Sequence, residues 1–222
     1  YSPDERLLEI FYFLVTAKEP VKLENLAEHL LVSKSTVVKD LDRLKAIYQS
    51  YDLQFQGNHE GMEISGKEEI IRRELVKRFI RTMDKHAVMD LTNLIIHKEK
   101  ITYKVFWRLF EEVDLDAVRS CIELLKTGLG MQLSDLEYLN LMGHFCILLK
   151  RAKLGKCPDR EEQHKPSPLM GFLTENIYDC LSKMTRLHQN EKQYIRYIIY
   201  LSSSSLYLME QPMPEGEAEE NV

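Results

Sequence analysis

The chain has 222 residues, of which 44% are hydrophobic and 29% are charged, and its formal net charge is −5. This composition excludes a disordered chain, and the length leaves room for two packed domains. The apolar runs are far shorter than the about 20 residues that cross a bilayer, and no signal-peptide pattern opens the chain. We therefore expect a cytoplasmic protein without a membrane partner.

The acidic net charge argues against a nucleic-acid partner until its distribution along the chain is considered. Residues 209–222 carry five Glu and no cation, whereas residues 67–85 carry seven Lys or Arg against four acids. Residues 1–66 carry seven cations against eleven acids. The rest of the chain is therefore near neutral once the acidic tail is set aside, but we expect weak nonspecific affinity for DNA.

No motif in the sequence indicates a metal, a cofactor or catalysis. The four cysteines, Cys121, Cys146, Cys157 and Cys180, are scattered without a CxxC pair, so we expect reduced thiols. No two histidines have the i, i+4 spacing of a helical metal site. Dinucleotide, P-loop and nucleophile-elbow motifs are absent. We predict a protein that is not an enzyme and that uses neither cofactor nor metal.

The first third of the sequence predicts three helices followed by a β-hairpin. Apolar residues recur at helical spacing in residues 4–17, 23–31 and 34–50, and Pro20 separates the first two segments. Residues 53–66 alternate apolar and polar side chains around a glycine-containing turn, which is typical of a hairpin. This order of elements is that of a winged helix-turn-helix.

After the hairpin, every predicted element is a helix. The expected helices lie at 67–83, 87–97, 101–112, 114–127, 134–154, 168–187 and 190–208. Residues 155–168 contain three prolines and many charges, which indicates a loop.

We therefore predict a mainly α fold. Its N-terminal winged helix-turn-helix domain with a small β-hairpin covers residues 1–66. Connecting helices follow in 67–113, and an all-helical regulatory domain occupies 114–208. The acidic tail is 209–222.

Two apolar residues mark the contact between the helices of the predicted helix-turn-helix. Ala27 falls where the two helices must approach closely, and Val37, ten residues later, closes the angle between them. A helical wheel centred on Val37 turns several polar residues outward. We expect these side chains to contact the phosphates or base edges of DNA. They are Ser35, Thr36, Lys39 and Arg43.

The tip of the hairpin supplies two further candidates for DNA contact. Asn58 and His59 lie where a wing would enter the neighbouring minor groove. A helical hairpin with a merely solvated polar face, or a winged helix that binds protein, would give the same pattern. The motif, the wing and the basic segment that follows together favour double-stranded DNA as the partner.

Two motifs give the N-terminal part a resemblance to a known family. VSKSTVVKDL (residues 32–41) and GMEISGKEEIIRREL (residues 61–75) resemble the helix-turn-helix and following segment of the mannitol- and cellobiose-operon activators of the BglG family. Regulators with DeoR-like or Mga-like helix-turn-helix domains share this pattern. Met62 stands where the family has an aromatic residue. The resemblance covers about residues 5–75 and implies a DNA-binding transcription regulator.

In that family the next segment is a PTS regulation domain, which the sugar phosphotransferase system phosphorylates on histidine. Residues 114–208 resemble it more weakly. The family has an Arg seven residues beyond its histidine, and His144 and Arg151 keep this spacing. We read His144 as lying in a polar lane at the edge of the core, accessible to a phosphoryl donor, with Arg151 available to pair with the added charge. A hydrogen-bonded structural histidine is the alternative.

One departure weakens the phosphorylation hypothesis. The family carries a second histidine on the last helix of the domain, after a Glu-x-x-aromatic pattern. Glu191 and Tyr194 keep that approach, but Ile198 and Ile199 occupy the place of the histidine. A domain with one phosphorylation site, or with none, follows from this substitution.

These observations predict a sequence-specific regulator of a carbohydrate-utilisation operon, controlled through its helical domain by phosphorylation or partner binding. We expect a homodimer, because one winged helix buries too little surface for tight operator binding. Phosphotransferase-system proteins are the expected protein partners. The alternative is a protein-interaction adaptor whose winged helix does not bind DNA. An RNA-binding antiterminator ranks last, because such proteins begin with a β-rich module and this chain begins with helices.

Overall fold

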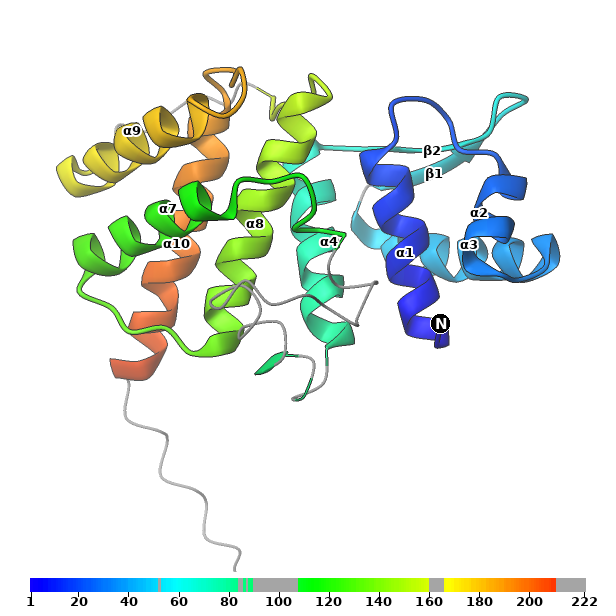
Figure 1. Ribbon diagram of the computed structural model, residues 1–222, viewed down its shortest axis with the longest axis horizontal. Coiled ribbons are helices and arrows are strands. Elements are labelled where there is room, and N and C mark those ends of the chain that lie inside the picture. The colour runs from blue at the N-terminus through cyan, green and yellow to red at the C-terminus, as the bar shows by residue number, and fades with distance from the viewer. Residues whose placement is uncertain (52, 84–85, 87, 90–107, 160–165, 211–222) are drawn as a thin grey trace, which may run out of the picture.

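The computed structural model describes residues 1–51, 53–83, 86, 88–89, 108–159 and 166–210 (Figure 1). The predicted fold class is confirmed, because helices dominate and a single two-stranded hairpin follows the first three helices. The N-terminal elements are α1 (Pro3–Thr16), α2 (Leu23–Leu30), α3 (Lys34–Tyr48), a 3₁₀ turn (Gln49–Tyr51), β1 (Gln54–Gly57) and β2 (Met62–Ser65). The later ones are α4 (Glu68–Thr82), α7 (Leu115–Leu129), α8 (Asp135–Lys153), α9 (Pro168–Ser182) and α10 (Glu191–Glu210).

Helices α2 and α3 form the helix-turn-helix. Ala27 and Val37 are both buried at its centre, as predicted. Leu31 joins the helices in the left-handed conformation, with φ of 54°, and its backbone N–H bonds back to Glu28. The turn is therefore short, and the Ser33 side chain caps the start of α3 by accepting a hydrogen bond from the backbone N–H of Thr36.

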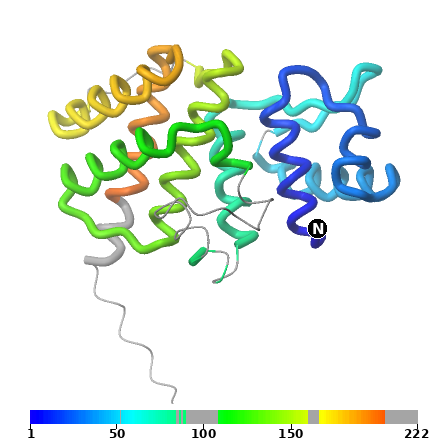
Figure 2. Tube along the Cα trace, viewed as in Figure 1, coloured from blue at the N-terminus to red at the C-terminus, as the bar shows by residue number. Residues whose placement is uncertain are grey.

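The wing is an antiparallel hairpin in which Phe55 pairs directly with Ile64. Residues directly opposite in a hairpin share a face, and Phe55 is buried while Ile64 packs against the same core. Val21 adds an isolated bridge to Met62, so the segment between α1 and α2 extends the sheet by one residue. The path of this segment along the hairpin is visible in Figure 2.

Gly61 closes the hairpin turn for a steric reason. Its φ is +147°, and a Cβ atom at this position would lie 2.7 Å from the carbonyl carbon of Val21. A backbone atom cannot move aside as the end of a flexible side chain can. The close approach of Val21 to the wing therefore requires glycine here.

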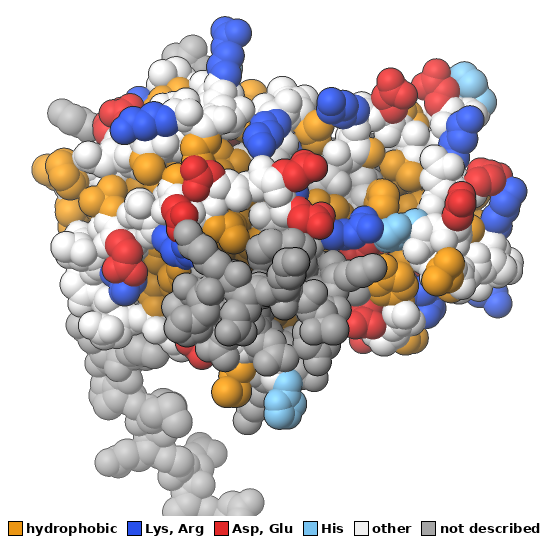
Figure 3. All heavy atoms as spheres, viewed as in Figure 1, with side chains coloured by type: hydrophobic (Ala, Val, Ile, Leu, Met, Phe, Trp, Pro, Cys, Tyr) orange, Lys and Arg blue, Asp and Glu red, His pale blue; other side chains and the backbone are white. Residues whose placement is uncertain are grey.

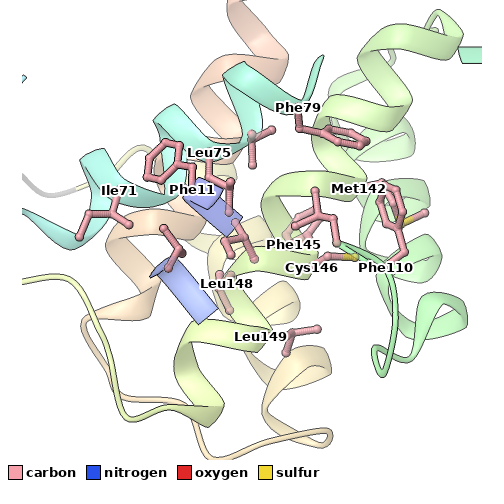
Figure 4. Packing of buried hydrophobic residues seen from close by; sticks show 14 of the residues in the cluster. Phe11, Ile71, Leu75, Phe79, Phe110, Met142, Phe145, Cys146, Leu148 and Leu149 are labelled. Carbon is pink, nitrogen blue, oxygen red and sulfur yellow. The ribbon is translucent and has the colours of Figure 1, made fainter. Parts of the chain in front are cut away.

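Helices α7 to α10 form the helical half of the molecule, and α8 lies at its centre. It packs against α4, α7, α10 and α1, and residues 141–149 are all buried. Figure 4 shows Phe145 and Leu148 of α8 among side chains of the neighbouring elements. Gly143 allows close contact with α4, since a Cβ there would lie 3.2 Å from Val76. One continuous cluster of buried apolar residues extends from α1 to α10.

Most predicted helices are present with bounds shifted by one or two residues, and α9 ends earlier than expected, at Ser182. The helices predicted at 87–97 and 101–112 lie largely outside the described residues. Where the second of these reaches described positions, residues 108–112 form turns. Glu112 has φ of 59°, which an α-helix cannot accommodate. The predicted tail at 209–222 also lies outside the description, except that α10 continues to Glu210.

All four cysteines are free thiols, as expected for the reduced state. Cys121 and Cys146 are buried, and Cys157 and Cys180 are half-buried. Among the described residues, no helix combines the length and the apolar character needed to cross a membrane.

Replacement of Phe55 by Ala tests the register of the wing. The ring lies 5.9 Å from the rings of both Phe11 and Tyr48, so its removal should lower the free energy of unfolding by about 3–5 kcal/mol. Gln56→Ala, on the exposed face of the same strand, should change it by less than about 0.5 kcal/mol. Both are measured by urea unfolding. Equal stability of Phe55→Ala and the parent would show that the strand register is wrong.

Candidate nucleic-acid interface and regulatory core

The outer face of α3 carries four cations, of which Lys39 and Arg43 were predicted to contact DNA. Both side chains are exposed. Within the described part of the chain Lys39 makes no ion pair, and Arg43 approaches Asp40 only to 3.7 Å. The other two cations have carboxylates of their own, Lys34 with Glu24 at 2.5 Å and Lys45 with Asp42 at 3.5 Å. Asp40 is already paired with Arg6 at 2.8 Å, so Lys39 and Arg43 are the cations of α3 best placed to meet an external anion.

Three hydroxyl groups gather at the N-terminus of α3. The Ser33 Oγ lies 2.8 Å from Ser35 Oγ and 2.9 Å from Thr36 Oγ1. Ser35 is exposed and Thr36 is half-buried. The positive end of the helix dipole and these hydroxyls form a local environment that suits a phosphate oxygen. Both predicted residues thus lie on the outer surface, but their hydroxyls also stabilise the helix start.

Asp40 was not singled out in the sequence, and it fixes the position of α3. Its carboxylate is buried and accepts hydrogen bonds from Arg6 Nε at 2.8 Å and from Arg6 Nη2 at 3.4 Å. Arg6 belongs to α1, so this bidentate pair ties the recognition helix to the first helix. An aspartate within the motif VSKSTVVKDL could have suggested this role, but its partner lies 34 residues away.

Asn58 and His59, the two residues predicted to contact DNA from the wing tip, have different surroundings. The Asn58 side-chain oxygen accepts hydrogen bonds from the backbone N–H groups of Glu60 and Gly61, at 2.8 and 3.1 Å. Its carbonyl group is therefore used to build the turn. The His59 side chain is 90% exposed and has Glu60 at 3.8 Å. Of the two, His59 is the one free to meet a partner.

The basic segment 67–85 was read as support for DNA binding, and the structure shows that its cations serve other contacts. Arg72 is fully buried. Arg73 stacks over the ring of Tyr197, and Arg78 donates from Nε to the Tyr48 hydroxyl at 3.1 Å. Lys77 lies 5.3 Å above the ring of Tyr51. Only Arg72 of these cations lies inside the molecule, while Arg73, Lys77 and Arg78 are half-buried beside tyrosine rings. Figure 3 shows acidic and basic side chains interspersed over the winged end.

His144 does not lie at an accessible edge of the core, so that expectation is wrong. It is 3% exposed, because it lies in the stretch 141–149 of α8, which is buried among the neighbouring helices. The His144 Nδ1 lies 2.8 Å from the Tyr194 hydroxyl. Burial, together with the charge of Arg73, lowers the pKa of His144 to about 3. The imidazole is therefore neutral at physiological pH.

Arg151 is likewise not available to a phosphoryl group on His144. It donates from Nε and Nη2 to the two oxygens of Glu68, at 2.8 and 2.5 Å. Its Nη1 donates to the backbone carbonyl of Val15 in α1. A buried guanidinium requires such partners, and here they come from α4 and α1. Arg151 thus connects the helical half to the winged unit.

Arg72 is the second member of the same buried network. It donates to Glu68 at 2.7 Å along α4 and to both carboxylate oxygens of Glu191 in α10, at 2.6 and 2.9 Å. Its Nη2 also donates to the carbonyl oxygen of Lys156, at 3.0 Å. The guanidinium carbon lies 4.9 Å from the centre of the Tyr194 ring. The two positive charges of Arg72 and Arg151 are therefore balanced inside the core by the two carboxylates of Glu68 and Glu191.

The two carboxyl groups of the network experience different environments. Burial favours the neutral acid of Glu68, but the hydrogen bond from Arg151 and the charges of both arginines lower its pKa below the ordinary value. Burial raises the pKa of Glu191, and its bonds with Arg72 only partly oppose this. Glu68 touches two guanidinium groups and Glu191 one, which accounts for the difference.

The network brings together residues that the sequence patterns had placed in separate motifs. Glu68 and Arg72 lie in the segment after the hairpin, Arg151 follows His144, and Glu191 and Tyr194 open the last helix. Sequence reasoning assigned Arg151 to phosphate binding and gave the others no partner. In the part of the chain that the structure describes, no group of three or more His, Cys, Asp or Glu side chains is arranged to hold a metal ion.

The comparison with known proteins agrees with the geometry of the N-terminal unit. Residues 6–56 match the family model described as "HTH domain", so the chain carries a helix-turn-helix domain. The chain is also 24% identical over 154 residues to the transcriptional regulator ManR of Bacillus subtilis (strain 168). The match covers 69% of this chain and 22% of that protein. The predicted resemblance to helix-turn-helix transcription regulators is thereby confirmed.

Replacement of Arg72 by Met tests the buried network. The change leaves Glu191 without its cation in the core, so the free energy of unfolding should fall by about 3–5 kcal/mol. Arg81→Met, at an exposed position of the same helix, should change it by less than about 0.5 kcal/mol. Urea unfolding followed by circular dichroism measures both. An Arg72→Met protein as stable as the parent would show that the network adds no net stability.

Proposed function

We propose that this protein is a DNA-binding transcription regulator that reads duplex DNA with α3. The observation that carries the proposal is the exposed pair Lys39 and Arg43 on the second helix of a helix-turn-helix, one and two turns beyond the hydroxyl-rich N-terminus. In such motifs the second helix enters the major groove, where Lys and Arg bind guanine edges or phosphates. The likeness to a transcriptional regulator supports the same function.

The charge of the winged unit sets the kind of binding that we propose. Acidic side chains lie close to the proposed contacts, with Asp42 66% exposed on α3 and Glu60 63% exposed at the wing tip. These carboxylates repel phosphate and should keep nonspecific affinity low. Discrimination between DNA sequences would then depend on a few base contacts, chiefly those of Lys39 and Arg43.

We further propose that the protein acts as a homodimer on a carbohydrate-utilisation operon. The dimer is supported by the small size of one recognition unit, because two units on one operator bury the surface that tight binding needs. The operon type is supported by the resemblance of residues 5–75 to carbohydrate-operon activators. The match covers 22% of the length of that transcriptional regulator, so the homodimer and the type of operon are proposals for this chain.

Control through the helical half is the third part of the proposal. His144 remains the candidate for phosphorylation by phosphotransferase-system proteins, and a cavity of about 460 Å³ borders its side chain. Transfer to His144 would require the ring to turn out of its contact with Tyr194. Partner binding to the helical half, without phosphorylation, is the other route of control.

A protein-interaction adaptor is the second candidate function. The observation that favours it is the pairing of Lys34 and Lys45 with neighbouring acids, which leaves α3 with little net positive charge. A helix with little positive charge attracts phosphates weakly, so a protein surface would then be the partner. Binding to DNA distinguishes the two functions directly.

Substitution of Lys39 or Arg43 by Ala tests the DNA interface. Each change should weaken binding to the preferred fragment, selected from genomic DNA, by about 1–3 kcal/mol if the side chain contacts a base. A phosphate contact would instead lower affinity for all fragments and reduce the salt dependence by about one ion. Lys183→Ala, an exposed cation at the end of α9, is the matched control. All are measured by gel shift over a salt series. Unchanged binding by both variants would show that α3 does not contact the DNA, and absence of binding by the parent would favour the adaptor.

Phosphorylation is tested with the general phosphotransferase proteins and labelled phosphoenolpyruvate. If His144 is the site, the protein should acquire an acid-labile label that His144→Ala abolishes. His188→Ala, which removes an exposed histidine, should leave labelling intact. If the wild-type protein takes up no label under conditions that label a known acceptor, control by phosphorylation is excluded and partner binding remains.

A further inference from the structure

A cavity of about 460 Å³ lies between α4, α8 and α10 and is not used by the proposed DNA interface. It is lined by residues 73–81 of α4, the first half of α8 and the middle of α10. Six residues matter for its chemistry: Arg73, Lys77, Arg81, Asn140, His144 and Tyr197. Its volume falls within the range of sites for small organic ligands.

Three cations line the cavity from one side. Arg73, Lys77 and Arg81 are spaced four residues apart, so they form one stripe along α4. The Arg73 guanidinium stacks on the Tyr197 ring, with 5.6 Å between its carbon and the ring centre. A contact of this kind with a ring does not use the N–H donors of a guanidinium group, which stay available to an anion. Within the described residues, Arg73 makes no hydrogen bond or ion pair.

Two carboxylates also border the cavity, but both are engaged elsewhere. Glu137 belongs to the capping box of α8, where one oxygen accepts from the backbone N–H and the hydroxyl of Ser134, at 2.8 and 2.7 Å. Glu74 is buried and lies 3.5 Å from Lys77. The three cations therefore exceed the lining carboxylates by one charge, and the excess falls around Arg73 and Arg81.

The remaining lining is suited to a polar organic molecule. The Asn140 carboxamide and the neutral His144 imidazole offer hydrogen bonds without adding charge. Ile80, Leu136 and Tyr197 supply apolar surface. Guanidinium groups bind phosphate and carboxylate in the same bidentate way, so both chemistries satisfy this lining.

We propose that this cavity binds a small organic anion, a molecule with at least one phosphate or carboxylate group on a polar body. Arg73 and Arg81 would hold the anionic group, and Asn140 with His144 would face the polar body. A bound anion would place a negative charge against α4. The same helix contacts α3, because Arg78 of α4 donates a hydrogen bond to Tyr48. The site requires neither DNA binding nor phosphorylation, so its test is independent of the proposed function.

Isothermal titration of the whole protein with glucose 6-phosphate, citrate and glucose tests the site at near-physiological salt. At least one of the two anions should bind saturably with a Kd below about 1 mM, and glucose should not. Arg73→Ala and Arg81→Ala should each weaken that binding by about tenfold or more. Arg186→Ala, an exposed cation outside the cavity, should leave it unchanged. Circular dichroism confirms that each variant is folded, and the exposed Arg81 keeps the test valid if Arg73→Ala does not fold.

Binding of glucose 6-phosphate alone would identify the phosphate group as the recognised feature, and binding of citrate alone would identify the carboxylate. Either result, with the two arginine variants weakened, supports the site. The proposal is overturned if neither anion binds, if glucose binds as well as glucose 6-phosphate, or if the two variants bind like the parent.

Discussion

The guanidinium of Arg72 is fully enclosed by protein, and the arrangement of the surrounding helices depends on satisfying it. Five hydrogen-bond donors and a full charge cannot be left unpaired in a core. Glu68, Glu191 and the Lys156 carbonyl meet that requirement from α4, from α10 and from the loop after α8. These three segments therefore have one relative position in which the charge is balanced.

Arg151 extends the same constraint to the winged unit. It shares Glu68 with Arg72 and bonds to the Val15 carbonyl at the end of α1. The backbone of α1, the helix that supports α3, is thus part of the network that holds α4, α8 and α10 together. A movement of α8 against α4 must replace these bonds or leave a buried charge unpaired. Change in the helical half would therefore reach α1 through polar contacts as well as through the shared apolar core.

The sequence predicted local features well and long-range polar contacts poorly. The start of α3 and the hairpin within residues 53–66 depend on a capping serine and on alternation of apolar and polar residues, which act within a few residues. The burial of His144 could not be predicted from such local signals, because its partner Tyr194 lies 50 residues away. The apolar stripe on α8 suggested one buried face, but four other helices enclose this helix. Helical periodicity predicts which residues are buried only where one side of the helix faces solvent, and residues 141–149 of α8 have no such side.

The use of the basic segment inside the molecule also changes how DNA binding would be achieved. If Arg72, Arg73 and Arg78 contacted phosphates, one protomer would have a broad electrostatic footprint. Because Arg72 pairs with Glu191, Arg78 bonds to Tyr48 and Arg73 lines the cavity beside Tyr197, the proposed interface of one protomer is limited to α3 and the wing tip. Few phosphate contacts mean a weak, salt-tolerant encounter for a single unit. Tight binding under the proposed function would then require two units on one operator, and the helical half is the part of the described chain available to join them.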